Sequence, residues 1–146
     1  GDTTMKKSVI LFSILFFTCN CQTSDRFVKI TTTGTYRGMI EHYLPQQKFQ
    51  RLPKWKPENS TPPPLSIQSA VVIAKKHAGE MYKTNAVFDL MYLNVMPKDD
   101  TNTTEVWFYL VCLNISTITN NPDPDPRFFI VIAMDGSVAT PKIITK

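Results

Sequence analysis

The 146-residue sequence is poor in the residues from which small catalytic and metal sites are usually built. It contains two histidines, three cysteines and five glycines, without a glycine-rich phosphate loop, a paired Cys or His motif or a serine nucleophile elbow. Its net charge is only +4, and the basic residues are scattered along the chain. These absences argue against nucleotide, zinc and serine-hydrolase chemistry, and the scattered charge argues against nucleic-acid binding.

The composition that remains is typical of one ordered domain. The hydrophobic fraction is 42% and the charged fraction 19%, which are ordinary values for a globular protein. Eleven prolines indicate extended, stiff connections rather than flexible ones. The length is sufficient for a single hydrophobic core, so we expect one domain.

The first 21 residues have the pattern of an export leader. Met5 is the expected start, the preceding residues are upstream additions, and Lys6 and Lys7 form a positive region ahead of the apolar run 9–17. This run is too short for a transmembrane helix, which needs about 20 apolar residues. The sequence therefore predicts an exported protein of the bacterial cell envelope, in the periplasm, anchored as a lipoprotein, or secreted.

Cys19 and Cys21 leave two routes of processing open. Either cysteine could be acylated, although the residues before each match a lipobox loosely, or a signal peptidase could cut after Cys21. The first route gives a membrane-anchored lipoprotein, and the second a released protein. In the second case Cys112 is the only cysteine left, so the fold has no internal disulfide.

Residues 22–64 are predicted to form a Pro-rich arm or tether. The pattern there is irregular, with one expected strand from Phe27 to Tyr36 and no second domain. The arm nevertheless contains more large apolar residues than a disordered linker, so we expect part of it to pack on the domain. Trp55, which lies between two lysines, is expected to dock the arm onto the domain rather than to stack on nucleic-acid bases.

Residues 65–146 are predicted to form an α+β domain. Ser66 is a good helix N-cap, and the apolar residues that follow have helical spacing to about Tyr82. Polar, turn-forming segments separate the later runs, so consecutive antiparallel pairing is expected. The fold class is therefore one amphipathic helix packed on a small antiparallel sheet of three to four strands. The expected strands are Ala86 to Met96, Glu105 to Ile115, Arg127 to Met134 and a short strand from Ser137 to Thr140 that Pro141 ends.

Two of these strands are apolar on both faces. Residues 105–115 and 127–134 show no alternation of apolar and polar side chains, which a sheet with one solvated face should have. One helix can cover only one face, so the arm, a second copy or a partner must cover the other. The side chains that we expect to form a binding face are Trp107, Tyr109, Val111, Phe129 and Val131.

The order of these elements resembles the PepSY-like family. The resemblance spans Pro64 to Thr140 and rests on Pro64-Leu65-Ser66 before an alanine-rich helix, on 107–111, and on the Asp135-Gly136 turn before the last strand. It implies a helix packed on a small antiparallel sheet, as in cystatin-like folds. PepSY-like domains are associated with envelope proteins and with inhibition or chaperoning of proteases, which implies binding rather than chemistry.

A few residues could still carry chemistry. Cys112 with His42 or His77 would be a nucleophile with a base, but a mid-strand thiol and a histidine on an apolar helix face are more typical of a core. Asp99-Asp100 and Asp123-Pro124-Asp125 could hold calcium, but no EF-hand spacing is present. We therefore predict no enzyme activity, no cofactor and no metal.

The leading hypothesis is a non-catalytic module that binds a protein or peptide through its apolar sheet face or an exposed edge strand. The alternatives are a structural or homodimeric lipoprotein without a small-molecule ligand, and a hydrolase that uses Cys112.

Overall fold

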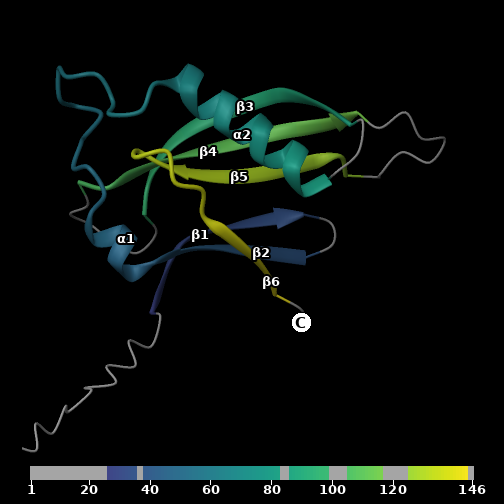
Figure 1. Cartoon of the computed structure of the whole chain (residues 1–146), viewed down its shortest axis with the longest axis horizontal. Coiled ribbons are helices and arrows are strands. Elements are labelled where there is room, and N and C mark those ends of the chain that lie inside the picture. Colours follow the sequence, from purple (N-terminus) through teal and green to yellow (C-terminus); the bar gives the residue numbers. More distant parts are fainter. Residues whose placement is uncertain (1–25, 36–37, 83–85, 99–104, 117–124, 145–146) are drawn as a thin grey trace, which may run out of the picture.

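The computed structural model describes residues 26–35, 38–82, 86–98, 105–116 and 125–144, and these form a mixed α+β fold (Figure 1). The predicted leader, with Cys19 and Cys21, lies outside the described residues, as do Asp99, Asp100 and Asp123. No helix in the described part of the chain is long and apolar enough to span a membrane. In chain order the elements are β1 (Phe27–Thr35), β2 (Gly38–Pro45), α1 (Gln46–Gln50), α2 (Ile67–Tyr82), β3 (Val87–Pro97), β4 (Trp107–Ser116), β5 (Arg127–Ala133) and β6 (Thr140–Ile144).

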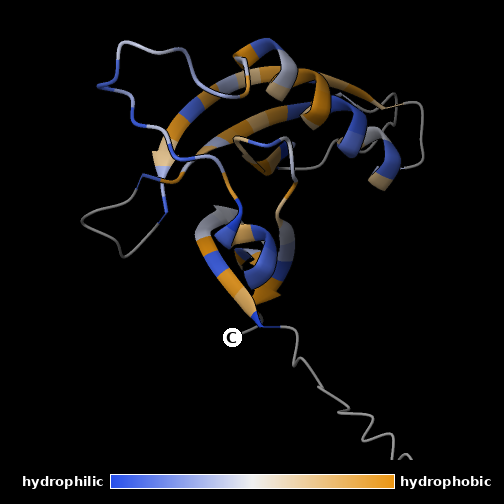
Figure 2. Cartoon of the chain, turned by 60° about the vertical axis from the view of Figure 1, so that its left-hand side comes forward, coloured by the Kyte–Doolittle hydropathy of each residue, from blue (hydrophilic) through white to orange (hydrophobic). Residues whose placement is uncertain are grey.

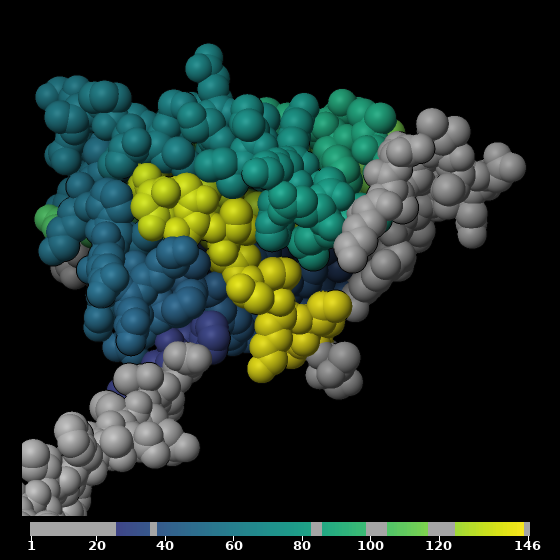
Figure 3. Space-filling view, viewed as in Figure 1, coloured from purple at the N-terminus to yellow at the C-terminus, as the bar shows by residue number. Residues whose placement is uncertain are grey.

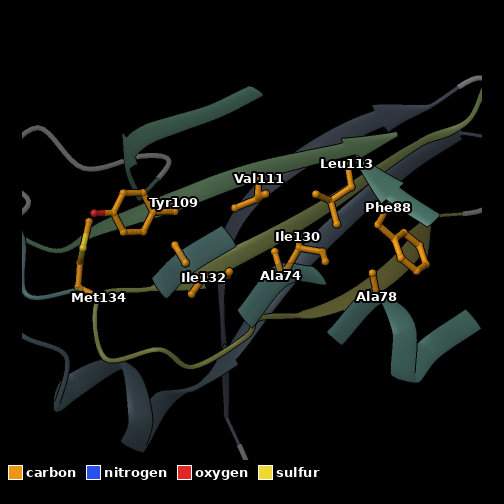
Figure 4. Packing of buried hydrophobic residues seen from close by; sticks show 10 residues of the cluster. Ala74, Ala78, Phe88, Tyr109, Val111, Leu113, Ile130, Ile132 and Met134 are labelled. Atoms are coloured by element: carbon orange, nitrogen blue, oxygen red, sulfur yellow. The ribbon is translucent and has the colours of Figure 1, made fainter. Parts of the chain in front are cut away.

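Helix α2 begins where the sequence predicts. The Ser66 hydroxyl accepts a hydrogen bond from the Ser69 backbone N–H at 3.1 Å, as an N-cap does. Three alanines four residues apart then form a fully buried stripe on one side of the helix (Ala70, Ala74 and Ala78). Their small size brings the helix close to the sheet, where its stripe meets aromatic and branched side chains of β3, β4 and β5 (Figure 4).

The larger sheet has the order β3-β4-β5, with both pairs antiparallel. Consecutive antiparallel pairing is thus confirmed. The α2 side of this sheet carries the odd-numbered residues of β4, among them Tyr109 and Leu113, together with Ile130 and Ile132 of β5. All four side chains are buried.

A second sheet, of order β1-β2-β6, packs on the opposite face of the larger one. Figure 2 shows this arrangement, with α2 on one side of the larger sheet and the smaller sheet on the other. Ile30 of β1 and Leu44 of β2 are buried against Phe108 of β4, which also stacks on Phe49 of α1. The sequence left three candidates for covering the second face, which are the N-terminal arm, a second copy and a partner. The N-terminal segment covers at least this part of that face.

Two expectations about secondary structure are wrong. The N-terminal segment is not merely a tether with one strand, because β2 and α1 follow β1. The short strand expected to end at Pro141 instead runs through it as β6, after an isolated bridge at Val138. The proline is tolerated because β6 pairs with no described strand other than β2, so that the missing N–H can lie on the unpaired side of this edge strand.

Trp55 fastens the Pro-rich loop to the domain, as expected. Its ring packs edge to face on Trp107 with centroids 6.5 Å apart, and its indole N–H donates to the Thr61 carbonyl. Its backbone N–H also donates to the Glu105 carbonyl at 2.7 Å. The loop before α2 is therefore held by both the side chain and the backbone of Trp55.

The same loop is fastened by Tyr109, which gives a first testable prediction. The Tyr109 hydroxyl donates to the Leu65 carbonyl at 2.6 Å, and burial raises the pKa of this phenol. Tyr109→Phe should lower the free energy of unfolding by about 1 kcal/mol, because the ring stays in place while the Leu65 carbonyl loses its partner. Urea unfolding followed by fluorescence measures this, and an unchanged stability would show that the bond does not hold the loop.

Candidate functional site

The five side chains expected to form one binding face do not lie on one face. Trp107, Tyr109 and Val111 are on the α2 side of the larger sheet, whereas Val131 packs in the core between the two sheets. The reason is the register, which places Val111 opposite Ile130, so that odd residues of β4 share a face with even residues of β5. Tyr109, Val111 and Val131 are also fully buried. Of the five, Phe129 lines an open pocket.

That pocket lies where β5 and β6 diverge. After Val131 the outer edge of β5 is occupied, because the Ala139 N–H donates to the Val131 carbonyl and the Ala133 N–H to the Ser137 carbonyl. Before Val131, no described strand pairs with this edge. The chain has left β5 to form β6, which joins β2 in the other sheet. A gap therefore opens between the first half of β5 and the smaller sheet.

The direction of the backbone groups on β5 follows from the hydrogen bonds at its two ends. The Ile115 N–H donates to the Pro126 carbonyl, so even-numbered residues of β5 direct their backbone groups toward β4. The odd-numbered residues Arg127 and Phe129 then direct theirs toward the gap. The Arg127 N–H is bonded to the Asp125 carboxylate at 3.3 Å. The Phe129 N–H and the carbonyls of both residues are left facing the gap.

The pocket has a volume of about 400 Å³, and most of its wall is apolar. It extends from the end of α2 across the start of β5 to β2 and β6. On the surface, the C-terminal segment runs between the layer that contains α2 and the N-terminal segment (Figure 3). The lining residues are Thr35, Gly38, Ile40, Met81, Tyr82, Ile115, Asp125, Arg127, Phe128, Phe129, Pro141 and Ile143.

An ion pair stands at the polar end of the pocket. The Arg127 guanidinium donates two hydrogen bonds to the Asp125 carboxylate, at 2.7 and 2.9 Å. The same guanidinium lies over the Phe129 ring, 5.7 Å from its centre. The carboxylate raises the pKa of Arg127, so the guanidinium stays charged. The pair supplies directional polar groups beside an apolar wall, the combination that ligand sites commonly have.

Cys112 is a buried side chain of the sheet interior, as the core interpretation of the sequence expects. Burial raises the pKa of its thiol, and its Sγ lies 4.0 Å from the Sδ of Met91. Within the described residues, no hydrogen bond or ion pair joins it to His42 or His77. A thiol with a raised pKa and no adjacent base has little thiolate at neutral pH.

The His, Cys, Asp and Glu side chains that the structure describes lie too far apart to gather at one metal ion. In the described ranges, no group of three or more His, Cys, Asp or Glu side chains could hold a metal ion. His42 is buried between the sheets, where its Nε2 lies 2.9 Å from the Thr33 hydroxyl and its Nδ1 has no hydrogen-bond partner among the described residues. His77 is half-buried on α2.

Comparisons with known proteins return no matching family model, no matching curated protein and no matching solved structure.

Proposed function

We propose that the protein is a non-catalytic binding module that takes up an extended peptide segment of another protein along the free half of β5. The observation that carries this proposal is that no described strand pairs with the outer edge of β5 from Arg127 to Phe129, beside an apolar pocket of about 400 Å³. An added strand would bond to the backbone groups of Arg127 and Phe129 that face the gap. One of its apolar side chains would occupy the pocket.

The geometry favours an extended peptide over a compact small molecule. A β-strand edge offers donors and acceptors at the spacing of another strand, and the pocket beside it offers room for alternate side chains. The ion pair of Asp125 and Arg127 would meet the peptide backbone or a polar side chain at one end. Affinity would then come mostly from main-chain bonds, and selectivity from the residue in the pocket.

The sequence predicts binding through an apolar sheet face or an exposed edge strand, and the proposed function uses the edge strand. The proposal also retains export to the cell envelope, with or without a lipid on Cys19 or Cys21, which the leader pattern indicates. A PepSY-like relationship is compatible with a helix on an antiparallel sheet, and it would agree with binding to a protein substrate or protease. No cofactor, metal or nucleic acid has a part in the proposed function.

A displayed library of random 12-residue peptides, panned on the full chain, tests the proposal. Selected peptides should bind Phe129→Pro about tenfold more weakly than the native protein, because proline removes the outward N–H on an edge where it leaves the β4 ladder intact. Phe129→Ala keeps this N–H and separates the loss of the ring from the loss of the backbone donor. Titration calorimetry with a synthetic copy of a selected peptide measures both effects.

The matched control is Val72→Ala, which truncates a side chain exposed on α2, away from the pocket lining. It should bind the peptide as the native protein does. Two outcomes would refute the edge of β5 and its pocket as the binding site. One is a set of peptides that bind Phe129→Pro with native affinity, and the other is a library that yields no binder sensitive to position 129.

A further inference from the structure

Within the residues that the structure describes, the outer edge of β3 is a second unpaired strand edge, independent of the pocket beside β5. Among the described strands β3 pairs only with β4, although it is 11 residues long. Proteins usually protect such an edge with lysines, prolines or very short strands. Here Asp89 is the single charge between Val87 and Pro97, and the exposed large side chains are Val87, Leu90, Met91, Tyr92 and Val95.

The backbone groups that point outward from β3 can be identified from the register. Because β4 directs its odd-numbered residues toward β5, its even-numbered residues bond to β3. The β3 residues opposite those even positions therefore point inward. A bulge between Leu90 and Tyr92 shifts the alternation by one residue. The outward-directed residues are Phe88, Leu90, Leu93 and Val95.

These four positions are symmetric about the point between Met91 and Tyr92. In an antiparallel pair of two copies centred there, Leu90 lies opposite Leu93 of the second copy, and Phe88 lies opposite Val95. All four side chains are on the α2 side of the sheet. The outward backbone groups of one copy thus meet those of the other, and every cross-strand pair on this side is apolar.

On the face opposite α2, the side chains of β3 from the two copies also pair favourably in the same register. Asp89 would lie opposite Asn94, where the carboxylate can accept a hydrogen bond from the amide. Met91 would lie opposite Tyr92, a contact of thioether and ring that is favourable. A register shifted by one residue would instead oppose Leu90 to Tyr92, whose backbone groups are already directed to β4.

We propose that two copies of this chain pair through β3 about this two-fold axis and join their larger sheets into one continuous sheet. The surface is self-complementary, which is what a closed two-fold dimer requires of an interface. Pairing also removes the exposed apolar edge of both copies, because each copy supplies the strand that the other lacks.

Opposite charge changes at Asn94 test the proposal and its register. Asn94 is exposed, so its replacement should not affect folding. Asn94→Asp places two like-charged pairs in each dimer and should weaken dimerisation about tenfold, whereas Asn94→Lys meets Asp89 of the second copy and should strengthen it. Sedimentation equilibrium of the full chain over a range of concentrations measures both constants. High salt should reduce both effects.

Gln68→Asp and Gln68→Lys are the matched controls, because they make the same changes in net charge on an exposed position of α2. They should leave the dimerisation constant unchanged. Leu90→Lys, which buries a charge against Leu93 of the second copy, should yield a monomer. A native chain that stays monomeric at every concentration would overturn the proposal. So would a dimer that survives Leu90→Lys, or Asn94 variants that both shift the constant in the same direction.

Discussion

Phe108→Ala is expected to lower the free energy of unfolding by about 3–5 kcal/mol, the usual cost of truncating a buried phenylalanine. The ring is fully buried between the two sheets and is stacked on Phe49, with centroids 6.5 Å apart. Its removal leaves a cavity that the stiff sheets on either side cannot close, so the loss exceeds the transfer free energy of the ring alone.

Chemical denaturation at equilibrium measures the loss, and Val72→Ala is again the control. Val72 is 67% exposed on α2, so its truncation should change the stability by less than about 0.5 kcal/mol. If Phe108→Ala were as mild as the control, the N-terminal segment would not be packed on the larger sheet. The experiment therefore tests the two-sheet architecture as well as one side chain.

The second large effect is a loss of stability in mild acid, caused by His42. Burial lowers the pKa of His42 from 6.5 to about 4, because the charged imidazolium would be desolvated between the sheets. Between these two values the unfolded chain binds a proton that the folded chain does not. The free energy of unfolding must therefore fall as the pH falls from about 6.5 toward 4, by about 2 kcal/mol at pH 5.

Unfolding of the native protein and of His42→Gln, measured at pH 7 and pH 5, isolates this contribution. The variant should be less stable at pH 7, because it disturbs the contact with Thr33, but it should lose less stability on acidification. His77→Gln is the control, since His77 is only half-buried on the helix. An equal acid sensitivity of the native protein and His42→Gln would show that His42 titrates normally in the folded state.

The local part of the fold could be predicted from the sequence. Ser66 marks the start of α2, the alanines that follow give its buried stripe, and turn-forming segments separate β3, β4 and β5. The two-sided apolar pattern of β4 also indicated correctly that both faces of this strand are covered. Each of these inferences depends on residues that are close in sequence, where propensity and periodicity are informative.

The long-range part could not be predicted in the same way. Strand β2 pairs with β6, and nothing in either segment specifies this partner. The polar segments between β3, β4 and β5 are too long to fix a register, so residue parity could not tell which of Trp107, Phe129 and Val131 share a face. For this reason the five side chains that the sequence predicts on one face lie on two.

The sequence does not predict the pocket beside β5, because this pocket forms where β6 diverges from β5. It exists because the turn at Gly136, where φ is +86°, returns the chain to β5 for a few residues before β6 leaves for the other sheet. The sequence places Asp125 and Arg127 two residues apart, a spacing that is compatible with an ion pair between them. The sequence suggests for Asp125 only a role as a calcium ligand, and nothing in the sequence places either residue beside a pocket.

The pairing of β2 with β6 also constrains how the chain acquires its structure during synthesis. On a ribosome the helix and the larger sheet emerge as a consecutive block, but the smaller sheet needs strands from both ends of that block. Pairing strands that are so far apart in the sequence raises the contact order of the fold, which slows folding. Until β6 has emerged, β2 is paired only with β1, and the nascent polypeptide exposes one unpaired strand edge, a surface that chaperones protect.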